Sequence, residues 1–355
     1  PSQGKVITRK GYSEHATGLN GNVETLAELK DGAIKKFICC NSDEINDVTN
    51  PASISNLGTG FTNARWQTVN MNANLLLFNG SDTPQVYDGS AITNSTISGS
   101  GLTPTELDGC NVHKNRLYTW STDDSAFWYG STNAIQGVLT KFDLAGIAPY
   151  GGNLIAMATW NHDGGDGVDD YALFLMSSGT ALLYDGSDPS DATNWSLIGI
   201  YQIGEPLSVR SIIKVGGDVA IMTKPDFVFF SEVFKNGGAV TSQTKLSGVA
   251  LESANAYSGN YGWEVVLYPK ASTGGWLFFN VPVANNTTYK QYGLNTITGA
   301  GFEFSNMNAR TWGLYDNNLY FGESGAIMKA DDGLNDNGNN IPCTVQAAYS
   351  DLGSP

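Results

Sequence analysis

Few side chains in this sequence could do chemistry at neutral pH. His15, His113 and His162 are its three histidines, and histidine is the usual base at that pH. None of them lies in a nucleophile or metal motif, because the chain has no G-x-S-x-G, no H-E-x-x-H and no phosphate-binding P-loop. We therefore predict that the protein is not an enzyme, has no catalytic residues and needs no cofactor.

A cluster of acids is the strongest candidate for metal binding. The segment WNHDGGDGVDDY places Asp163, Asp166, Asp169 and Asp170 close together among glycines, and carboxylates on a loop can bind calcium. The spacing does not match an EF-hand, whose final bidentate Glu is missing. We interpret this segment, and DDGLNDNGNN at 331–340, as solvated turns between strands, because Asp and Asn are also common turn residues. The four aspartates remain the calcium candidates, and we predict no metal site.

Aromatic pairs and cysteines have structural explanations. Neighbouring residues of a strand face opposite sides, so core packing explains pairs such as Phe127–Trp128 better than a carbohydrate platform does. The same applies to the pairs at 229–230 and 278–279. The cysteines lack the C-x-x-C spacing of a zinc site, and we expect mostly buried, reduced thiols. They are Cys39, Cys40, Cys110 and Cys343.

These residues are carried by short repeated strands. MNANLLLFNGSDTPQVYDGS at 71–90 and YALFLMSSGTALLYDGSDPS at 171–190 both end in YDGS, and their separation would equal two propeller blades. Weaker copies begin at 113, 215, 274 and 315. The first segment has predicted strands at Ile34–Cys40 and Glu44–Val48. We predict an all-β propeller of six or seven blades, in which the segment GKVITRKGY at 4–12 completes the last blade.

Composition limits the possible partners. The chain has 19 basic and 34 acidic side chains, for a net charge of −15, which disfavours tight binding to a phosphate backbone. The same charge would keep the protein in solution, or would let a polyanion slide past without sticking. No apolar run reaches the roughly 18 to 20 residues of a membrane span, and no signal peptide opens the chain. We expect assembly in the cytoplasm.

Several motifs in order resemble a known family. They are GYSEHATGL at 11–19, VETLAE at 23–28, GFTNARWQTVN at 60–70, NGSDTPQVYDG at 79–89, LNTITGAGFEF at 294–304, NLYFGESGAIMKADDG at 318–333 and AAYSDLGSP at 347–355. Together they resemble the tail nozzle, or tail tubular, proteins of short-tailed bacteriophages (podoviruses), over nearly the whole chain.

The resemblance implies a structural virion protein assembled in the host bacterium. It implies a hexameric ring at the distal end of a short phage tail, bound to the tail adaptor protein and to fibres or tailspikes. Double-stranded DNA would pass through the ring without sequence-specific binding, and the ring would help to retain and eject the genome. The resemblance does not assign the residues that line or gate the channel.

Both ends of the sequence look truncated. We expect a propeller over 1–341 and, over 342–355, a strand that leads toward a platform or channel domain whose parts are missing at both ends. The alternative function is a propeller that binds a carbohydrate or a host receptor, which would require pockets repeated from blade to blade. A propeller hydrolase is a further alternative, and replacing His162, Asp163 and Asp166 would abolish its activity.

Overall fold

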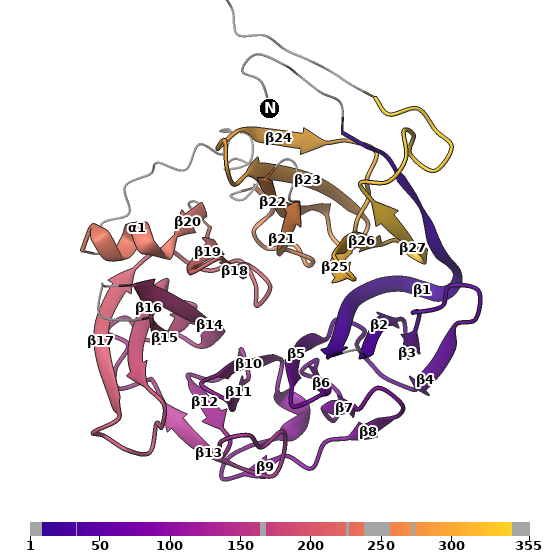
Figure 1. Ribbon diagram of the computed structural model, residues 1–355. Helices are drawn as coiled ribbons and strands as arrows, with labels where there is room; N and C mark the ends of the chain where they lie inside the picture. The colour runs from indigo at the N-terminus through magenta and orange to yellow at the C-terminus, as the bar shows by residue number, and fades with distance from the viewer. Residues whose placement is uncertain are drawn as a thin grey trace, which may run out of the picture.

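The chain forms a ring of β-sheets around a central axis (Figure 1). This computed structural model describes residues 9–32, 34–163, 168–224, 227–237, 256–270 and 274–342. The prediction of an all-β propeller is confirmed. The described residues also contain the short α-helix α1 (Phe230–Lys235), a 3-10 helix at Pro104–Glu106 and two helical residues at 256–257. No helix within the described ranges has the length and apolar character that crossing a membrane requires.

The described strands form six hydrogen-bonded sheets, and the largest sheet joins two blades. The first blade contains the second half of β1 (Tyr12–Asp31), β2 (Ile34–Asn41), β3 (Glu44–Asp47) and β4 (Ser55–Thr59). The second contains β5 (Gln67–Met71), β6 (Asn74–Phe78), β7 (Gln85–Tyr87) and β8 (Ile92–Asn94). The third contains β10 (Gly109–His113), β11 (Arg116–Trp120), β12 (Ala126–Tyr129) and β13 (Val138–Asp143), with β9 (Ser98–Gly99) at its edge.

The remaining blades follow in chain order. The fourth contains β14 (Leu154–Asp163), β15 (Val168–Met176), β16 (Thr180–Gly186) and β17 (Trp195–Gln202). The fifth contains β18 (Ile212–Val215), β19 (Asp218–Met222) and β20 (Phe227–Phe229), and the sixth contains β21 (Glu264–Lys270), β22 (Gly274–Ala284), β23 (Thr288–Asn295) and β24 (Gly301–Phe304). The last contains β25 (Thr311–Tyr315), β26 (Asn318–Gly322), β27 (Ser324–Ala330) and the first half of β1.

Strand β1 closes the ring. Its residues from Tyr12 to Asn22 pair with β27, and those from Val23 to Asp31 pair with β2. Within the described residues, Tyr12–Asn22 completes the last blade, which includes the final residue of the predicted segment at 4–12. Residues 4–8 of that segment lie outside the described residues. The first strands of successive blades pack side by side around the axis, from β1 through β5, β10, β14, β18, β21 and β25 back to β1. By this count the ring has seven blade units, two of which share β1.

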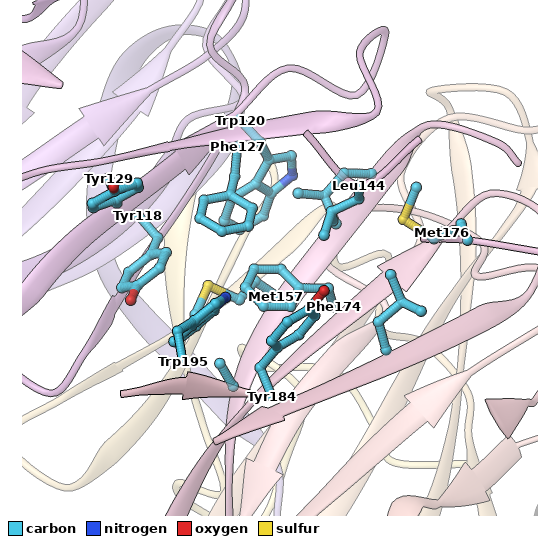
Figure 2. Close-up of a cluster of buried hydrophobic side chains, with 14 residues drawn as sticks. Tyr118, Trp120, Phe127, Tyr129, Leu144, Met157, Phe174, Met176, Tyr184 and Trp195 are labelled. Atoms are coloured by element: carbon cyan, nitrogen blue, oxygen red, sulfur yellow. The ribbon is translucent and has the colours of Figure 1, made fainter. Parts of the chain in front are cut away.

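Hydrophobic side chains fill the space between adjacent blades. Figure 2 shows the cluster between the third and fourth blades, where the rings of Phe127 and Phe174 stack with centroids 4.7 Å apart. Trp128, the next residue, packs in the cluster on the other side of the same blade. This arrangement confirms that the aromatic pair serves the core. Burying one such side chain contributes roughly 1.5–3 kcal/mol, so each blade is stabilised mainly by its two neighbours.

The hairpin turns explain the sequence repeat. Two-residue loops with positive φ join the first two strands of the second, third and last blades, as a type I′ turn requires. Asn occupies the second position in two of them, at Asn115 (φ 58°) and Asn317 (φ 61°), while the fifth blade has a Gly-Gly pair at 216–217. Asn can take the place of Gly at this second loop position, because its short polar side chain tolerates the left-handed backbone conformation.

Candidate binding site on the ring axis

Most side chains of the aspartate cluster that we considered as calcium candidates, and interpreted as a solvated turn, lie outside the described residues. The aspartate cluster falls on the hairpin between β14 and β15, and residues 164–167, including Asp166, are not described. Asp163 ends β14 and Asp169 lies in β15, whereas Asp170 accepts a hydrogen bond from Asn161. Among the residues the structure describes, no group of three or more His, Cys, Asp or Glu side chains could hold a metal ion.

The second Asp-rich segment, 331–340, is not simply a solvated turn, and our interpretation of it was wrong at Asp336. This side chain is 1% exposed and forms a bidentate pair with Arg9, with N–O distances of 2.7 and 2.6 Å. The backbone around it bonds to Tyr12, whose N donates to Asn335 O at 3.1 Å. Such a cation partner offsets the cost of burying a carboxylate. Asp336 therefore fixes the start of β1 to the end of the propeller.

The side chains of the two described histidines, His15 and His113, pack against other residues of the propeller. His15 is half-buried against Phe37 and Tyr320, and burial lowers its pKa. His113 is buried, with Nδ1 3.0 Å from Thr159 Oγ1, and burial lowers its pKa from 6.5 to about 4. The third, His162, lies in β14, but its side chain is outside the described residues.

The centre of the ring is occupied by Arg210, which precedes β18. Its guanidinium reaches residues of four other blades, so a single side chain links segments that are far apart in the sequence. Burial lowers the pKa of Arg210, the charge of Arg65 lowers it further, and the Glu264 carboxylate opposes both effects. The guanidinium donates to Trp66 O (2.6 Å), Thr25 Oγ1 (2.8 Å), Glu24 O (3.1 Å), Thr311 Oγ1 (3.1 Å) and Glu264 Oε2 (3.1 Å).

Glu264, the first residue of β21, is the anionic centre of this network. Its Oε1 accepts from the backbone N of Trp312 at 3.1 Å, and its Oε2 lies 3.6 Å from Arg65 NH2. Arg65 also donates to Trp263 O at 2.9 Å. Two guanidinium groups thus share one buried carboxylate at the axis, and backbone and hydroxyl groups satisfy most of the remaining donors. Such a network stabilises a single arrangement of the blades only while all of its members are present.

Two cavities lie at successive levels along the inner strands. One, of about 380 Å³, is bordered by Thr25, Trp66 and Arg210. The other, of about 650 Å³, is bordered by Glu24 and Ala64, which precede Thr25 and Trp66 in the chain, and by Tyr261. We call the second one the axial cavity; its wall also includes Asn22, Asn63, Asn285 and Asn286.

The axial cavity combines an aromatic face, amides and a carboxylate. Tyr261 is 41% exposed, and its ring lies over Arg65, whose guanidinium carbon is 5.2 Å from the ring centroid. Burial raises the pKa of the Tyr261 hydroxyl. Glu24 is 7% exposed, and its Oε2 has no hydrogen-bond partner among the described residues. A small apolar surface with a few convergent polar groups is the usual form of a ligand site.

Sequence reasoning did not identify this site. Glu24 and Arg65 lie within VETLAE and GFTNARWQTVN, which carried the family resemblance but were not assigned a role. A signal was present: Arg65, Arg210 and Glu264 are isolated charged residues within or just before apolar stretches of the sequence. Charged residues in such positions are rarely buried unless they are paired.

The fold and site define a β-propeller with a closed axis and a polar cavity on that axis. No family model matches the sequence, and no curated protein matches it significantly. Among solved structures, the WD40 β-propeller domain of Doa1 is 12% identical, with a TM-score of 0.53 over 90% of this chain and 96% of that chain.

Two further structures show the same architecture. The extracellular domain of the hybrid two-component system BT4673 from B. thetaiotaomicron has a TM-score of 0.58 at 12% identity, over 90% of this chain and 39% of that one. BBS1N, solved in complex with ARL6DN, has a TM-score of 0.54 at 10% identity, over 94% and 99% of the two chains. At these identities the likeness establishes the propeller fold alone.

Proposed function

We propose that this chain is a propeller-type binding module, without catalytic activity, that recognises a carbohydrate or a host receptor. The observation that carries the proposal is the axial cavity, which is bordered by Glu24, Tyr261 and four asparagines. The described histidines, His15 and His113, are engaged elsewhere, with Val48 O and Thr159 respectively. Binding therefore accounts for the polar groups at the axis without requiring a reaction. In the sequence analysis we required such a module to have pockets repeated from blade to blade; the present proposal places binding in the single axial cavity instead.

Binding to cell surfaces tests this proposal. Fluorescently labelled protein is applied to a glycan array and to a panel of intact bacteria, with heat-unfolded protein as the control. Saturable binding to a defined glycan or to some of the strains is expected. Absence of saturable binding to both the array and every strain would refute the binding role.

The resemblance to phage tail nozzle proteins supports a second candidate function. In this proposal the chain is a subunit of a hexameric ring in a virion, bound to an adaptor and to fibres or tailspikes. Because Arg210 links inner strands of different blades across the propeller axis, DNA would have to pass through a channel enclosed by the six subunits together. The net charge of −15 suits a surface past which DNA slides.

The mass of the assembly tests this second proposal. Mass photometry and negative-stain imaging should show a ring of about six subunits with a central hole, formed by this chain or by a longer natural polypeptide that contains it. A monomer at micromolar concentration in both cases would refute the nozzle function. Basic residues lining the hole would refute the proposed sliding surface.

A further inference from the structure

We propose that the axial cavity binds one ring of an uncharged sugar against the face of Tyr261. This inference rests on the proposed binding function, and it names the site and the ligand class. Sugars present an apolar C–H face and a rim of hydroxyl groups, so a matching site needs an aromatic face, hydrogen-bond acceptors and amides. The axial cavity contains all three.

Tyr261 supplies the aromatic face. One side of its ring lies over the Arg65 guanidinium, at 5.2 Å from the ring centroid, while 41% of the residue is exposed and borders the cavity. Arg65 is itself anchored to Trp263 O and beside Glu264, so the tyrosine ring rests on a fixed support. The backbone N of Tyr261 donates to Asn285 Oδ1 at 2.8 Å, which holds this amide at the wall. A rigid aromatic face loses little conformational entropy on binding.

Glu24 supplies an acceptor that requires a donor. The residue is more than nine-tenths buried and borders the axial cavity. Its Oε2 has no hydrogen-bond partner among the described residues and is closed to solvent, so a ligand in the cavity would reach this oxygen after a rotation of the Glu24 side chain. Leaving a buried carboxylate oxygen unpaired is unfavourable, and a sugar hydroxyl is a donor of suitable size. The hydrogen bond would be charge-assisted and correspondingly strong.

The local charges disfavour an anionic ligand. Arg65 and Arg210 both pair with Glu264 and do not line the axial cavity, where Glu24 is the one charged lining residue among the described residues. An anionic sugar would be repelled by Glu24 and by the net charge of −15. The cavity volume of about 650 Å³ suits a mono- or disaccharide.

Titration with defined sugars tests the inference. Glucose, galactose, mannose, N-acetylglucosamine and their disaccharides are titrated by saturation-transfer NMR and tryptophan fluorescence, with glucuronic acid and sialyllactose as charged probes. We expect at least one neutral sugar to bind, and Tyr261→Ala and Glu24→Gln to weaken that binding by about tenfold. Tyr261→Phe, which keeps the ring, and Tyr150→Ala, which removes an exposed tyrosine outside the cavity, should change it less than twofold.

The outcomes separate this inference from the binding function. If a neutral sugar binds equally well to wild type and to Tyr261→Ala, the axial site is wrong and the binding function stands. If cells are bound but no neutral sugar is, or a charged sugar binds more tightly, the ligand class is wrong. If neither cells nor sugars are bound, both proposals fail. Unfolding midpoints of Glu24→Gln and Tyr261→Ala equal to wild type would show that any weakened binding is not a folding defect.

Discussion

Replacing Arg210 by methionine should destabilise the ring more than any surface charge substitution. Methionine keeps the length and apolar stem of the side chain but removes the guanidinium. The change deprives Glu264, which is 7% exposed, of its partner at 3.1 Å. It also removes the donors that reach Thr25, Trp66 and Thr311. Each of these residues belongs to or adjoins a different inner strand. The substitution therefore removes hydrogen bonds to several blades at once.

The expected magnitude follows from the burial of the pair. Removing one partner of a buried ion pair typically costs about 3–5 kcal/mol, because the remaining charge stays uncompensated. Arg65 remains 3.6 Å from Glu264 and compensates part of that charge. We therefore expect the free energy of unfolding to fall by about 3 kcal/mol. The double variant Arg210→Met with Glu264→Gln should lose clearly less than the sum of the two single variants, since no buried charge is then stranded.

Equilibrium urea unfolding measures this loss, provided that tryptophan fluorescence and far-UV circular dichroism give coincident transitions. The matched control is Lys224→Met, which breaks the pair with Glu205, where both side chains are about half exposed. An exposed pair contributes about 1 kcal/mol or less. A loss for Arg210→Met no larger than that of the control would refute the view that Arg210 ties the blades together.

Two further predictions concern a buried histidine and a packed glycine. Because the folded-state pKa of His113 is lowered from 6.5 to about 4, stability should be complete above pH 6.5 and fall by about 3 kcal/mol as the pH drops toward 4. His113→Gln should flatten this part of the profile in urea titrations at several pH values, and an unchanged slope would contradict the assignment. A Cβ at Gly109 would lie 2.0 Å from the Trp120 ring, so Gly109→Ala should lower the free energy of unfolding by about 1–3 kcal/mol. Gly146→Ala, where nothing lies within 4 Å of the added Cβ, is the control, and equal effects at both positions would show that the ring contact is not tight.

The strands could be read from the sequence because their signals are local. The predicted strands Ile34–Cys40 and Glu44–Val48 correspond to β2 (Ile34–Asn41) and β3 (Glu44–Asp47) within one residue at each end. Apolar side chains, β-branched residues and turn residues lie within a few positions of each other and dictate these elements directly. Repetition of the same hairpin then indicated the propeller.

The axial site could not be read in the same way. Glu24, Arg65, Arg210 and Glu264 come from different blades and meet only because the ring closes. Asp336 was misjudged for the same reason, because its partner Arg9 lies at the other end of the chain. The local sequence pattern of a turn-forming aspartate is the same whether its side chain is exposed to solvent or buried in an ion pair, so the pattern does not distinguish the two cases. Such pairs depend on tertiary structure, which local propensity does not encode.

The division of β1 between two blades has a consequence for the order of folding. During synthesis, Val23–Asp31 can pair with β2 soon after both have emerged, whereas Tyr12 must wait for Ala330, its partner in β27. The entropy lost in closing this loop rises only slowly with its length, but the search is slow because the contact is so distant in sequence. We therefore expect the pairing of the first half of β1 with β27 to form last and to close the ring. We expect nascent chains that lack β27 to keep an open sheet edge, a species prone to aggregation that completion of the ring removes.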